Sequence, residues 1–230
     1  MAYDFDKIAK NYDRLNLIMT LGFDRRWRRH AVKSLGLHPT DIVLDVACGT
    51  GDMAEELHRV GDCKVFACDI SDEMLAVARQ KSKGTNVYEK ANAEELPYGD
   101  AFFDAVTCAF GIRNFINLEK GLQEMVRVLK VGGKMAILEM ATPDCSIIKP
   151  FYNLYTRRII PWLGNRFAGN REAYTYLPTS IERFPKGKTL MGILELLGLK
   201  VKQHKYMFGV CRLYLCNKIL TTGNTTLPTS

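Results

Sequence analysis

The sequence predicts a single α/β domain whose seven-stranded sheet is mostly parallel and ends with an antiparallel strand. From residue 41 to residue 139, short apolar runs alternate with amphipathic segments, the pattern of βαβ units around a parallel sheet. Near the C-terminus, Phe208-Gly209 separates two further expected strands, and a glycine there favours a hairpin. A length of 230 residues with 47% hydrophobic residues suits one domain, expected over residues 1–220.

The expected elements follow from apolar periodicity and from stop signals. Val131-Gly132-Gly133 supplies such a stop after the third helix. Helices are expected at residues 52–60, 72–81, 118–129 and 189–197. Strands are expected at residues 42–46, 64–68, 86–90, 103–110, 134–139, 200–207 and 210–216.

Two segments fall outside the βαβ pattern. Residues 1–38 are expected to form a helical cap, helical from residue 5 to about residue 35. Residues 141–185 form an insert rich in aromatic side chains, expected to be helical over 147–163 and irregular afterwards. Its place in the chain suits a lid over the carboxyl edge of the sheet. The Thr/Gly/Asn/Ser-rich tail, residues 221–230, is expected to be disordered.

Charge is distributed unevenly along the chain. The net charge is +7, and residues 146–230 hold 13 Lys/Arg against 3 Asp/Glu. This basic third could attract an anionic membrane surface or a nucleic acid, or it could be a solvated face. No apolar run approaches the roughly 18 residues that span a bilayer, so any membrane contact is expected to be peripheral.

Cysteine and histidine usage gives little support for a metal site. The seven cysteines show no CxxC spacing, and the four histidines form no HxxxH or HExxH pair. No metal is therefore expected. The N-terminus opens with charged residues rather than the apolar stretch of a signal peptide, which favours a reducing cytoplasmic location.

A glycine-rich turn follows the first expected strand. The run Ile42-Val43-Leu44-Asp45-Val46-Ala47-Cys48-Gly49-Thr50-Gly51-Asp52 reads as a buried strand, a turn and a helix start. Small residues, Gly49 and Gly51 among them, let a ligand approach the backbone, and the helix N-terminus offers free N–H groups. Asp45 suits a ligand ammonium group.

Polar residues end the next two strands. Asp69 ends the second strand, where its carboxylate can accept both hydroxyls of a ribose. Asn92-Ala93 follows the third, where an amide and a backbone N–H can bind adenine. A dinucleotide fingerprint GxGxxG would place a third small residue at position 54, and Ala54 satisfies it, so that motif alone does not decide. Asp45 sits poorly beside a pyrophosphate, which favours S-adenosylmethionine as the cofactor.

Six blocks of sequence are distinctive when they are taken together. They are Tyr12-Asp13-Arg14-Leu15-Asn16, Arg25-Arg26-Trp27, Phe110-Gly111-Ile112-Arg113-Asn114-Phe115, Arg127-Val128-Leu129-Lys130-Val131-Gly132-Gly133, Ile137-Leu138-Glu139 and Tyr174-Thr175-Tyr176-Leu177-Pro178-Thr179-Ser180-Ile181. In these blocks the chain resembles the ubiquinone/menaquinone biosynthesis C-methyltransferases, and the similarity extends over nearly the whole chain to about Lys218.

The resemblance implies a class I methyltransferase fold (Rossmann-like) and C-methylation of a prenylated quinol, demethylmenaquinol to menaquinol. Thr50, Asp69, Asn92 and Ala93 match the family's cofactor positions. A benzoquinol intermediate of ubiquinone synthesis, or a nucleic acid, remains an alternative acceptor. The chain departs from the family at Leu15, Thr20, Asp24 and Ala141, where Met, Ser, His and Ser are usual.

Three residues are candidates for the chemistry. Arg113, just past the fourth strand, could stabilise the oxyanion that develops on a quinol oxygen, with Asn114 fixing its orientation. Tyr12, like Asp13 beside it, could contact the hydroxyl or remove its proton. Each has a structural alternative: Arg113 could simply pair with Glu139, and Tyr12 could pack the cap.

The expected partners follow from this chemistry. The insert's aromatic side chains could line an apolar channel for a prenyl tail, or could be ordinary core. A quinol in lipid implies peripheral contact with an anionic membrane at its inner, cytoplasmic face, and a homo-oligomer is possible. No Asn-Pro-Pro-Tyr tetrapeptide follows the fourth strand, which disfavours nucleic acid. Polar Arg113 and Asn114 beside the pocket disfavour a non-enzymatic adenosine-binding protein.

Overall fold

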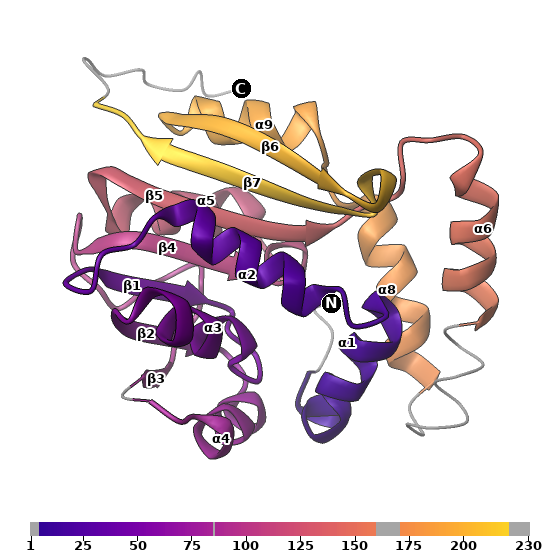
Figure 1. Cartoon of the computed structure of the whole chain (residues 1–230), viewed down its shortest axis with the longest axis horizontal. Coiled ribbons are helices and arrows are strands. Elements are labelled where there is room, and N and C mark those ends of the chain that lie inside the picture. The colour runs from indigo at the N-terminus through magenta and orange to yellow at the C-terminus, as the bar shows by residue number, and fades with distance from the viewer. Residues whose placement is uncertain (1–4, 85, 160–170, 221–230) are drawn as a thin grey trace.

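The computed structural model describes residues 5–84, 86–159 and 171–220. Seven strands in these residues form one sheet in the order β3-β2-β1-β4-β5-β7-β6 (Figure 1). Neighbouring strands are parallel except β7, which is antiparallel to both β5 and β6, as the sequence predicts. The strands are β1 (Ile42–Val46), β2 (Lys64–Asp69), β3 (Val87–Lys90), β4 (Phe103–Ala109), β5 (Leu129–Met140), β6 (Leu199–Tyr206) and β7 (Cys211–Lys218).

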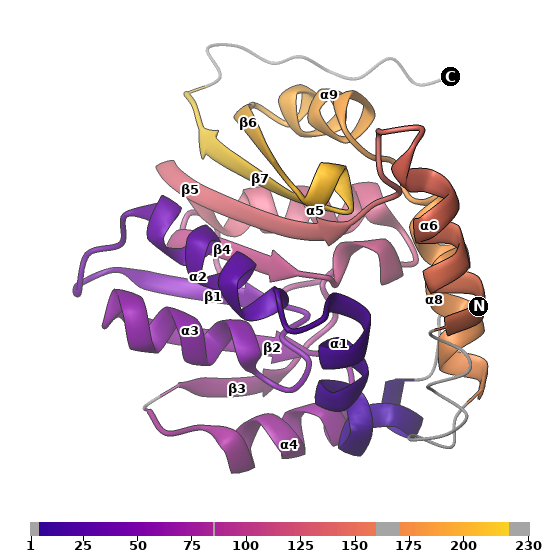
Figure 2. The same ribbon diagram turned by 45° about the vertical axis from the view of Figure 1, so that its right-hand side comes forward.

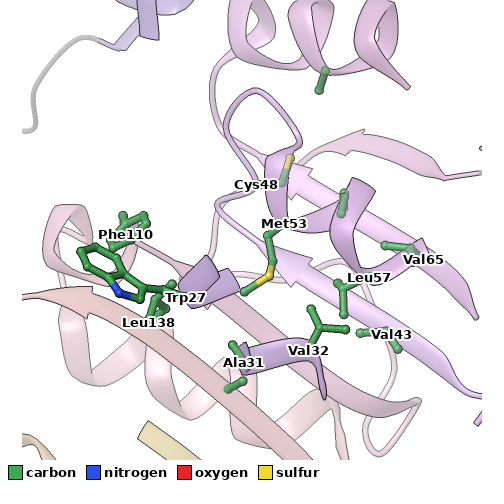
Figure 3. Packing of buried hydrophobic residues seen from close by; sticks show 14 of the residues in the cluster. Trp27, Ala31, Val32, Val43, Cys48, Met53, Leu57, Val65, Phe110 and Leu138 are labelled. Carbon is green, nitrogen blue, oxygen red and sulfur yellow. The ribbon is translucent and has the colours of Figure 1, made fainter. Parts of the chain in front are cut away.

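Helices cover both faces of the sheet, so its central strands are apolar on both sides. Val43 of β1 packs in the cluster under α2, α3 and α4, whereas its neighbour Leu44 packs in the cluster under α5 and α9. Figure 3 shows Val32 and Leu57 next to Val43 in the first cluster, with Trp27 beside Phe110 and Leu138. The helices are α2 (Asp24–Leu35), α3 (Asp52–Gly61), α4 (Asp72–Lys81), α5 (Leu118–Val128) and α9 (Lys188–Leu196).

Side-chain caps fix where two of these helices begin. The Ser71 hydroxyl accepts the Met74 N–H at the start of α4, and the Asn117 side chain accepts the Lys120 N–H at the start of α5. Each cap satisfies a backbone donor that has no partner inside its helix. Both helices start directly after the carboxyl edge of the sheet, so these caps also help to define that edge.

The expected separation of α5 from β5 by the double glycine is wrong. Helix α5 ends at Val128, and β5 begins at Leu129, so the two glycines lie inside the strand. A Cβ at Gly133 would lie 2.7 Å from the Leu129 side chain and 2.9 Å from the Asp104 carbonyl oxygen. The pairing with β4 shifts register between Phe103 and Ala105. The glycines therefore accommodate an irregularity in the strand rather than terminate the helix.

The N-terminal cap is helical, as expected. It comprises a 3-10 segment η1 (Phe5–Asn11), helix α1 (Tyr12–Thr20) and helix α2. The Ser71 hydroxyl donates to Asp6, which ties η1 to the start of α4. The cap thus reaches from one flank of the sheet to the ends of its central strands (Figure 1).

The insert forms helices beside α1, at the edge where the parallel strands end (Figure 2). Helix α6 (Ile148–Leu154) and the π-helix η3 (Tyr155–Ile159) confirm the expected helix as far as Ile159, while 160–163 lies outside the described residues. The irregular path expected after residue 163 is wrong for α8 (Arg171–Arg183). Pro178 lies inside this helix, but Ile181 is buried and Tyr176 bonds to Asn114. Tertiary contacts therefore offset the unfavourable proline.

A short 3-10 turn, η4 (Met207–Gly209), joins β6 to β7 and confirms the expected hairpin. Phe208 and Gly209 both have positive φ there, 56° and 92°. Among the described helices none is long and apolar enough to cross a membrane. The tail expected to be disordered, residues 221–230, lies outside the described residues.

Candidate functional site

A cavity of about 810 Å³ opens at the carboxyl ends of β1, β2, β3 and β4, beneath the cap. This is where ligands of open α/β sheets collect. Six of the residues singled out in the sequence line it: Tyr12, Gly49, Asp69, Asn92, Ala93 and Asn114. Four others, Asp45, Thr50, Gly51 and Arg113, lie behind this lining.

The glycine-rich turn is shaped partly by packing. Gly51 has φ of 84°, and a Cβ on it would lie 2.9 Å from the Tyr88 hydroxyl and 3.1 Å from the Ala78 methyl. Gly49 has φ of 54°, and its open side faces the Tyr12 ring. Gly49 therefore exposes backbone to the cavity, whereas Gly51 allows α3 to start close to β3 and α4.

Asp69 is held by the backbone on both sides. Its Oδ2 accepts the Gly49 N–H at 2.8 Å, and its Oδ1 accepts the Ser71 N–H at 3.0 Å. Burial raises the pKa of Asp69, and these two hydrogen bonds oppose that shift. Each carboxylate oxygen keeps a further lone pair for a ligand hydroxyl. The residue thus fixes the glycine-rich turn and faces the cavity at once.

Asn92 is oriented by the turn that it starts. Its Oδ1 accepts the Glu94 N–H at 3.0 Å, and its carbonyl oxygen accepts the Glu95 N–H at the same distance. The side-chain Nδ2 remains as a donor. Four apolar residues that the sequence did not single out also line the cavity: Ile70, Met74, Phe115 and Ile116.

The Thr50 side chain contacts the cap and does not line the cavity. Its hydroxyl donates to Asp13 Oδ1 at 2.6 Å. Lys81 Nζ lies 2.7 Å from Asp13 Oδ2 and 2.6 Å from Asp52 Oδ1. This network joins α1, α3 and α4. It engages both oxygens of Asp13, which does not line the cavity, so Asp13 is poorly placed to remove a substrate proton.

Asp45 is fully buried in β1 and has one open acceptor. Thr107 donates to its Oδ1 at 2.8 Å, while Oδ2 has no hydrogen-bond partner among the described residues. Burial raises the pKa of Asp45 to about 7, although the Thr107 hydrogen bond and the nearby Arg28 guanidinium oppose it. An unsatisfied buried carboxylate is costly, so this residue is suited to a cationic partner.

Arg113 and Glu139 form a buried ion pair, the structural alternative raised for Arg113. Arg113 Nη1 lies 2.5 Å from Glu139 Oε1, and their side chains are 5% and 2% exposed. The same Nη1 donates to the Phe110 carbonyl at 2.6 Å. Arg113 Nε, however, is buried without a hydrogen-bond partner among the described residues. The guanidinium therefore keeps one donor in reserve.

Tyr12 and Asn114 flank this guanidinium. Burial raises the pKa of the Tyr12 phenol, against the opposing effects of nearby Arg113 and Arg28. The Tyr176 hydroxyl donates to Asn114 Oδ1 at 3.0 Å, which joins helix α8 of the insert to the end of β4. The cap, the sheet and the insert therefore meet around Arg113.

A second cavity, of about 780 Å³, lies between the cap, the insert and the β6–β7 turn. Its lining is almost entirely apolar, apart from the side-chain hydroxyl groups of Thr20 and Thr156. The residues include Met19, Trp27, Met140, Ile148, Phe151, Tyr152, Tyr155, Ile181 and Val210. Among the described aromatic side chains of the insert, Phe151, Tyr152 and Tyr155 line this cavity, whereas Phe184 packs in the core. Within the described part of the chain, no group of three or more His, Cys, Asp or Glu could hold a metal ion.

Residues 2–218 match the model of the ubiE/COQ5 methyltransferase family. The demethylmenaquinone methyltransferase of Bacteroides fragilis is 41% identical over 221 residues, covering 93% of this chain and 90% of that protein. The ubiquinone/menaquinone biosynthesis C-methyltransferase UbiE of Geobacter sp. is 41% identical over 222 residues, covering 93% of this chain and 94% of that protein.

The fold agrees with this assignment. A solved S-adenosylmethionine-dependent methyltransferase of Thermotoga maritima, described as a possible histamine N-methyltransferase, has a TM-score of 0.65 at 22% identity. The structural match covers 93% of this chain and 98% of the Thermotoga maritima chain. Sequence, fold and the cavity at the strand ends agree: the chain belongs to the ubiE/COQ5 methyltransferase family and is an S-adenosylmethionine-dependent methyltransferase.

Proposed function

We propose that this enzyme methylates a ring carbon of a prenylated quinol in respiratory quinone biosynthesis, with demethylmenaquinol as the acceptor. The names of the relatives from Bacteroides fragilis and Geobacter support a quinone-related acceptor. The second name covers both menaquinone and ubiquinone, so a benzoquinol is the alternative acceptor.

One observation carries the proposal: Arg113 lines neither cavity itself but has a neighbour in each of them. Asn114 lines the cavity at the strand ends. On the other side, Tyr152 lines the apolar cavity, and the Arg113 charge lowers the pKa of that phenol against the larger effect of burial. A ring placed at Arg113 could therefore meet a cofactor on one side and extend an apolar tail into the other.

The cavity at the strand ends fits S-adenosylmethionine. The orphaned Oδ2 of Asp45 suits the ammonium group, although this carboxylate lies behind the lining. Asp69 would accept ribose hydroxyls, and Asn92 with the Ala93 N–H would bind adenine. Thr50 and Gly51 would act indirectly by shaping the turn, as their contacts with Asp13 and Tyr88 indicate. When bound, the cofactor supplies an activated methyl group on a sulfonium.

The protein's task is then to make a ring carbon nucleophilic. As a ring hydroxyl loses its proton, negative charge develops on its oxygen, and Arg113 Nε is a donor free to stabilise it. Tyr12 lies in the cavity beside Arg113 and is the candidate to contact that hydroxyl. Asn114 orients the site through its bond to Tyr176. The ring carbon would take the methyl group as the bond between the methyl carbon and the sulfonium sulfur breaks, with its electron pair left on sulfur. The ring C–H proton would then leave to solvent as the ring oxygen regains a proton, which restores the aromatic quinol.

A prenylated acceptor resides in lipid, so we also propose that the enzyme works at the cytoplasmic face of the membrane as a peripheral protein. The apolar second cavity supports this, because a tail must pass from bilayer to protein without crossing water.

Methyl transfer to reduced demethylmenaquinol and to a demethylated benzoquinol of matched tail length tests the acceptor. We expect transfer to the naphthoquinol to be faster. Mass analysis of lipid quinones after deletion of the gene tests the assignment in the cell, where the demethylated quinone should accumulate. Unchanged quinones in the deletion strain would contradict the proposed function.

A further inference from the structure

The mouth of the apolar cavity is rimmed by exposed apolar side chains from three separate segments. Leu21 at the end of α1 is 63% exposed, Phe151 of α6 is 68% exposed, and Met207 of the hairpin turn is 42% exposed. All three also line the cavity. Segments distant in sequence therefore bring solvent-exposed apolar groups to one opening, on the side of the molecule where Figure 2 shows α6 and α8 of the insert.

Neighbouring residues extend this apolar surface beyond the cavity. Leu17 lies one turn before Leu21, and Ile147 and Leu154 share a face of α6 with Phe151. Phe208 follows Met207 and is 68% exposed. We call these residues the apolar rim: Leu17, Leu21, Ile147, Phe151, Leu154, Met207 and Phe208. Exposed apolar residues occur singly on most surfaces, whereas a contiguous group marks an interaction site.

Two exposed cations border the rim. Arg25 and Arg26 share a surface hollow with Leu21 and Phe23. Neither arginine forms an ion pair with a described residue. Arg25 also lines a neighbouring hollow with Asp52 and Glu56, and these two carboxylates pair with Lys81 and Arg59.

The acids near the rim are already neutralised. Asp144 lies 2.7 Å from Lys205 Nζ and also pairs with Arg212. Glu182 lies 2.7 Å from Arg157. The rim is therefore apolar at its centre and positively charged at its border.

We propose that the apolar rim, with Arg25 and Arg26, docks the enzyme onto an anionic lipid bilayer and opens the apolar cavity toward the acyl chains. Apolar groups would enter the boundary between headgroups and acyl chains, while the cations contact lipid phosphates. In a two-fold contact with a second copy, the same cations would approach one another and repel. The proposal rests on the proposed quinol acceptor, and it assigns docking to one surface built from the cap, the insert and the β6–β7 turn rather than to the total positive charge of residues 146–230.

The C-terminal third supplies a matched control. Lys200 and Lys202 are exposed on β6, the edge strand of the sheet, and form no ion pair with a described residue. Lysines on an edge strand prevent it from pairing with a strand of another molecule, and this role is enough to explain Lys200 and Lys202. If total positive charge drove membrane binding, reversing these two lysines would weaken it as much as reversing Arg25 and Arg26.

The test is co-sedimentation of the purified protein with phosphatidylcholine vesicles that contain or lack phosphatidylglycerol. Arg25→Glu/Arg26→Glu should weaken binding to the anionic vesicles at least tenfold, whereas Lys200→Glu/Lys202→Glu should change it less than twofold. Ile147→Gln/Leu154→Gln, which does not alter the cavity lining, should also weaken binding at least tenfold. Equal losses in the two charge variants, or normal binding by the rim variants, would overturn the proposal.

Two further measurements separate this proposal from the proposed function and from self-association. Arg25→Glu/Arg26→Glu should keep its melting temperature and its methyl transfer to a soluble quinol with a single prenyl unit. A wild type that binds vesicles but methylates no quinol would contradict the function alone. Light scattering that shows a dimer in the wild type and a monomer in Ile147→Gln/Leu154→Gln would make the rim a contact between copies and overturn bilayer docking.

Discussion

Arg113 Nη1 lies 2.5 Å from Glu139 Oε1 in a nearly dry environment, yet the Arg113 Nε has no hydrogen-bond partner among the described residues. The ion pair holds the guanidinium at the end of β4, because Glu139 lies on the neighbouring strand β5. One contact thus performs a structural task and leaves a donor for chemistry. The two interpretations of Arg113 that the sequence allows are compatible.

Arg113→Ala should lower the rate of methyl transfer by about a hundredfold, as removal of one oxyanion donor does, with cofactor affinity nearly unchanged. Lysine should restore little, because it cannot reproduce the planar guanidinium. Single-turnover rates and calorimetric titration with S-adenosylmethionine check both statements.

A control is needed because Arg113→Ala leaves Glu139 buried without its cation. Breaking such a pair costs about 3–5 kcal/mol of folding free energy. Arg113→Met/Glu139→Gln removes both charges and should recover most of the melting temperature but not the turnover. Recovery of turnover in this double variant would leave Arg113 with only its structural role.

Asp69→Ala should weaken S-adenosylmethionine binding by about 1.5–3 kcal/mol, the range for hydrogen bonds to a charged group. The side chain also accepts the Gly49 and Ser71 N–H groups, so the variant should lose some thermal stability as well. Isothermal calorimetry on protein shown to be folded by circular dichroism is the measurement. Unchanged affinity would remove Asp69 from the cofactor site.

Asp45→Asn should reveal the pH dependence of the site. Because the folded-state pKa is about 7, against 3.8 in the unfolded chain, the folded protein holds a proton that the unfolded chain releases between these values. The free energy of unfolding of ligand-free wild type should therefore fall as pH rises from about 4 to 7, by a few kcal/mol. Asp45→Asn lacks this loss, so its relative stability should increase from pH 5 to pH 8.

Cofactor affinity should show the opposite trend, since a ligand ammonium group needs the ionised carboxylate. Wild-type affinity should rise from pH 5.5 to 7, whereas Asp45→Asn should bind more weakly and with a flatter pH dependence. Identical profiles for the two proteins would show that Asp45 does not interact with the ligand charge.

Gly51→Ala should destabilise the protein by about 1–3 kcal/mol, combining left-handed backbone strain with a Cβ 2.9 Å from the Tyr88 hydroxyl. Tyr88→Phe removes that hydroxyl, so the double variant should be more stable than the sum of the single effects predicts. Chemical denaturation of the four proteins in this cycle measures the coupling, and strict additivity would show that Tyr88 is not the obstacle.

Ile148→Trp should fill part of the apolar cavity that Ile148 lines. The Michaelis constant for a quinol with a long prenyl tail should rise at least tenfold, whereas that for a quinol with one prenyl unit should change little. Steady-state kinetics with the two acceptors decide the matter. Equal effects on both would place the tail elsewhere.

The sequence by itself determined the sheet, the antiparallel last strand, the cap and the cofactor-binding edge. These features depend on local periodicity and on one topological rule, that the carboxyl ends of parallel strands lie together. Glycines predicted the local structure less reliably. Gly132 and Gly133 lie inside β5 instead of ending the helix, and Gly51 is required partly because the Tyr88 side chain lies close to it.

Only the tertiary structure decided how individual side chains are used. Thr50 turns to Asp13, 37 positions away in the chain, and Arg113 pairs with Glu139, 26 positions away. The apolar cavity is assembled from the cap, the insert and the hairpin turn. Helix α8 persists through Pro178 because Ile181 is buried and Tyr176 bonds to Asn114. Side-chain direction depends on long-range packing and charge pairing, which a local sequence pattern does not encode.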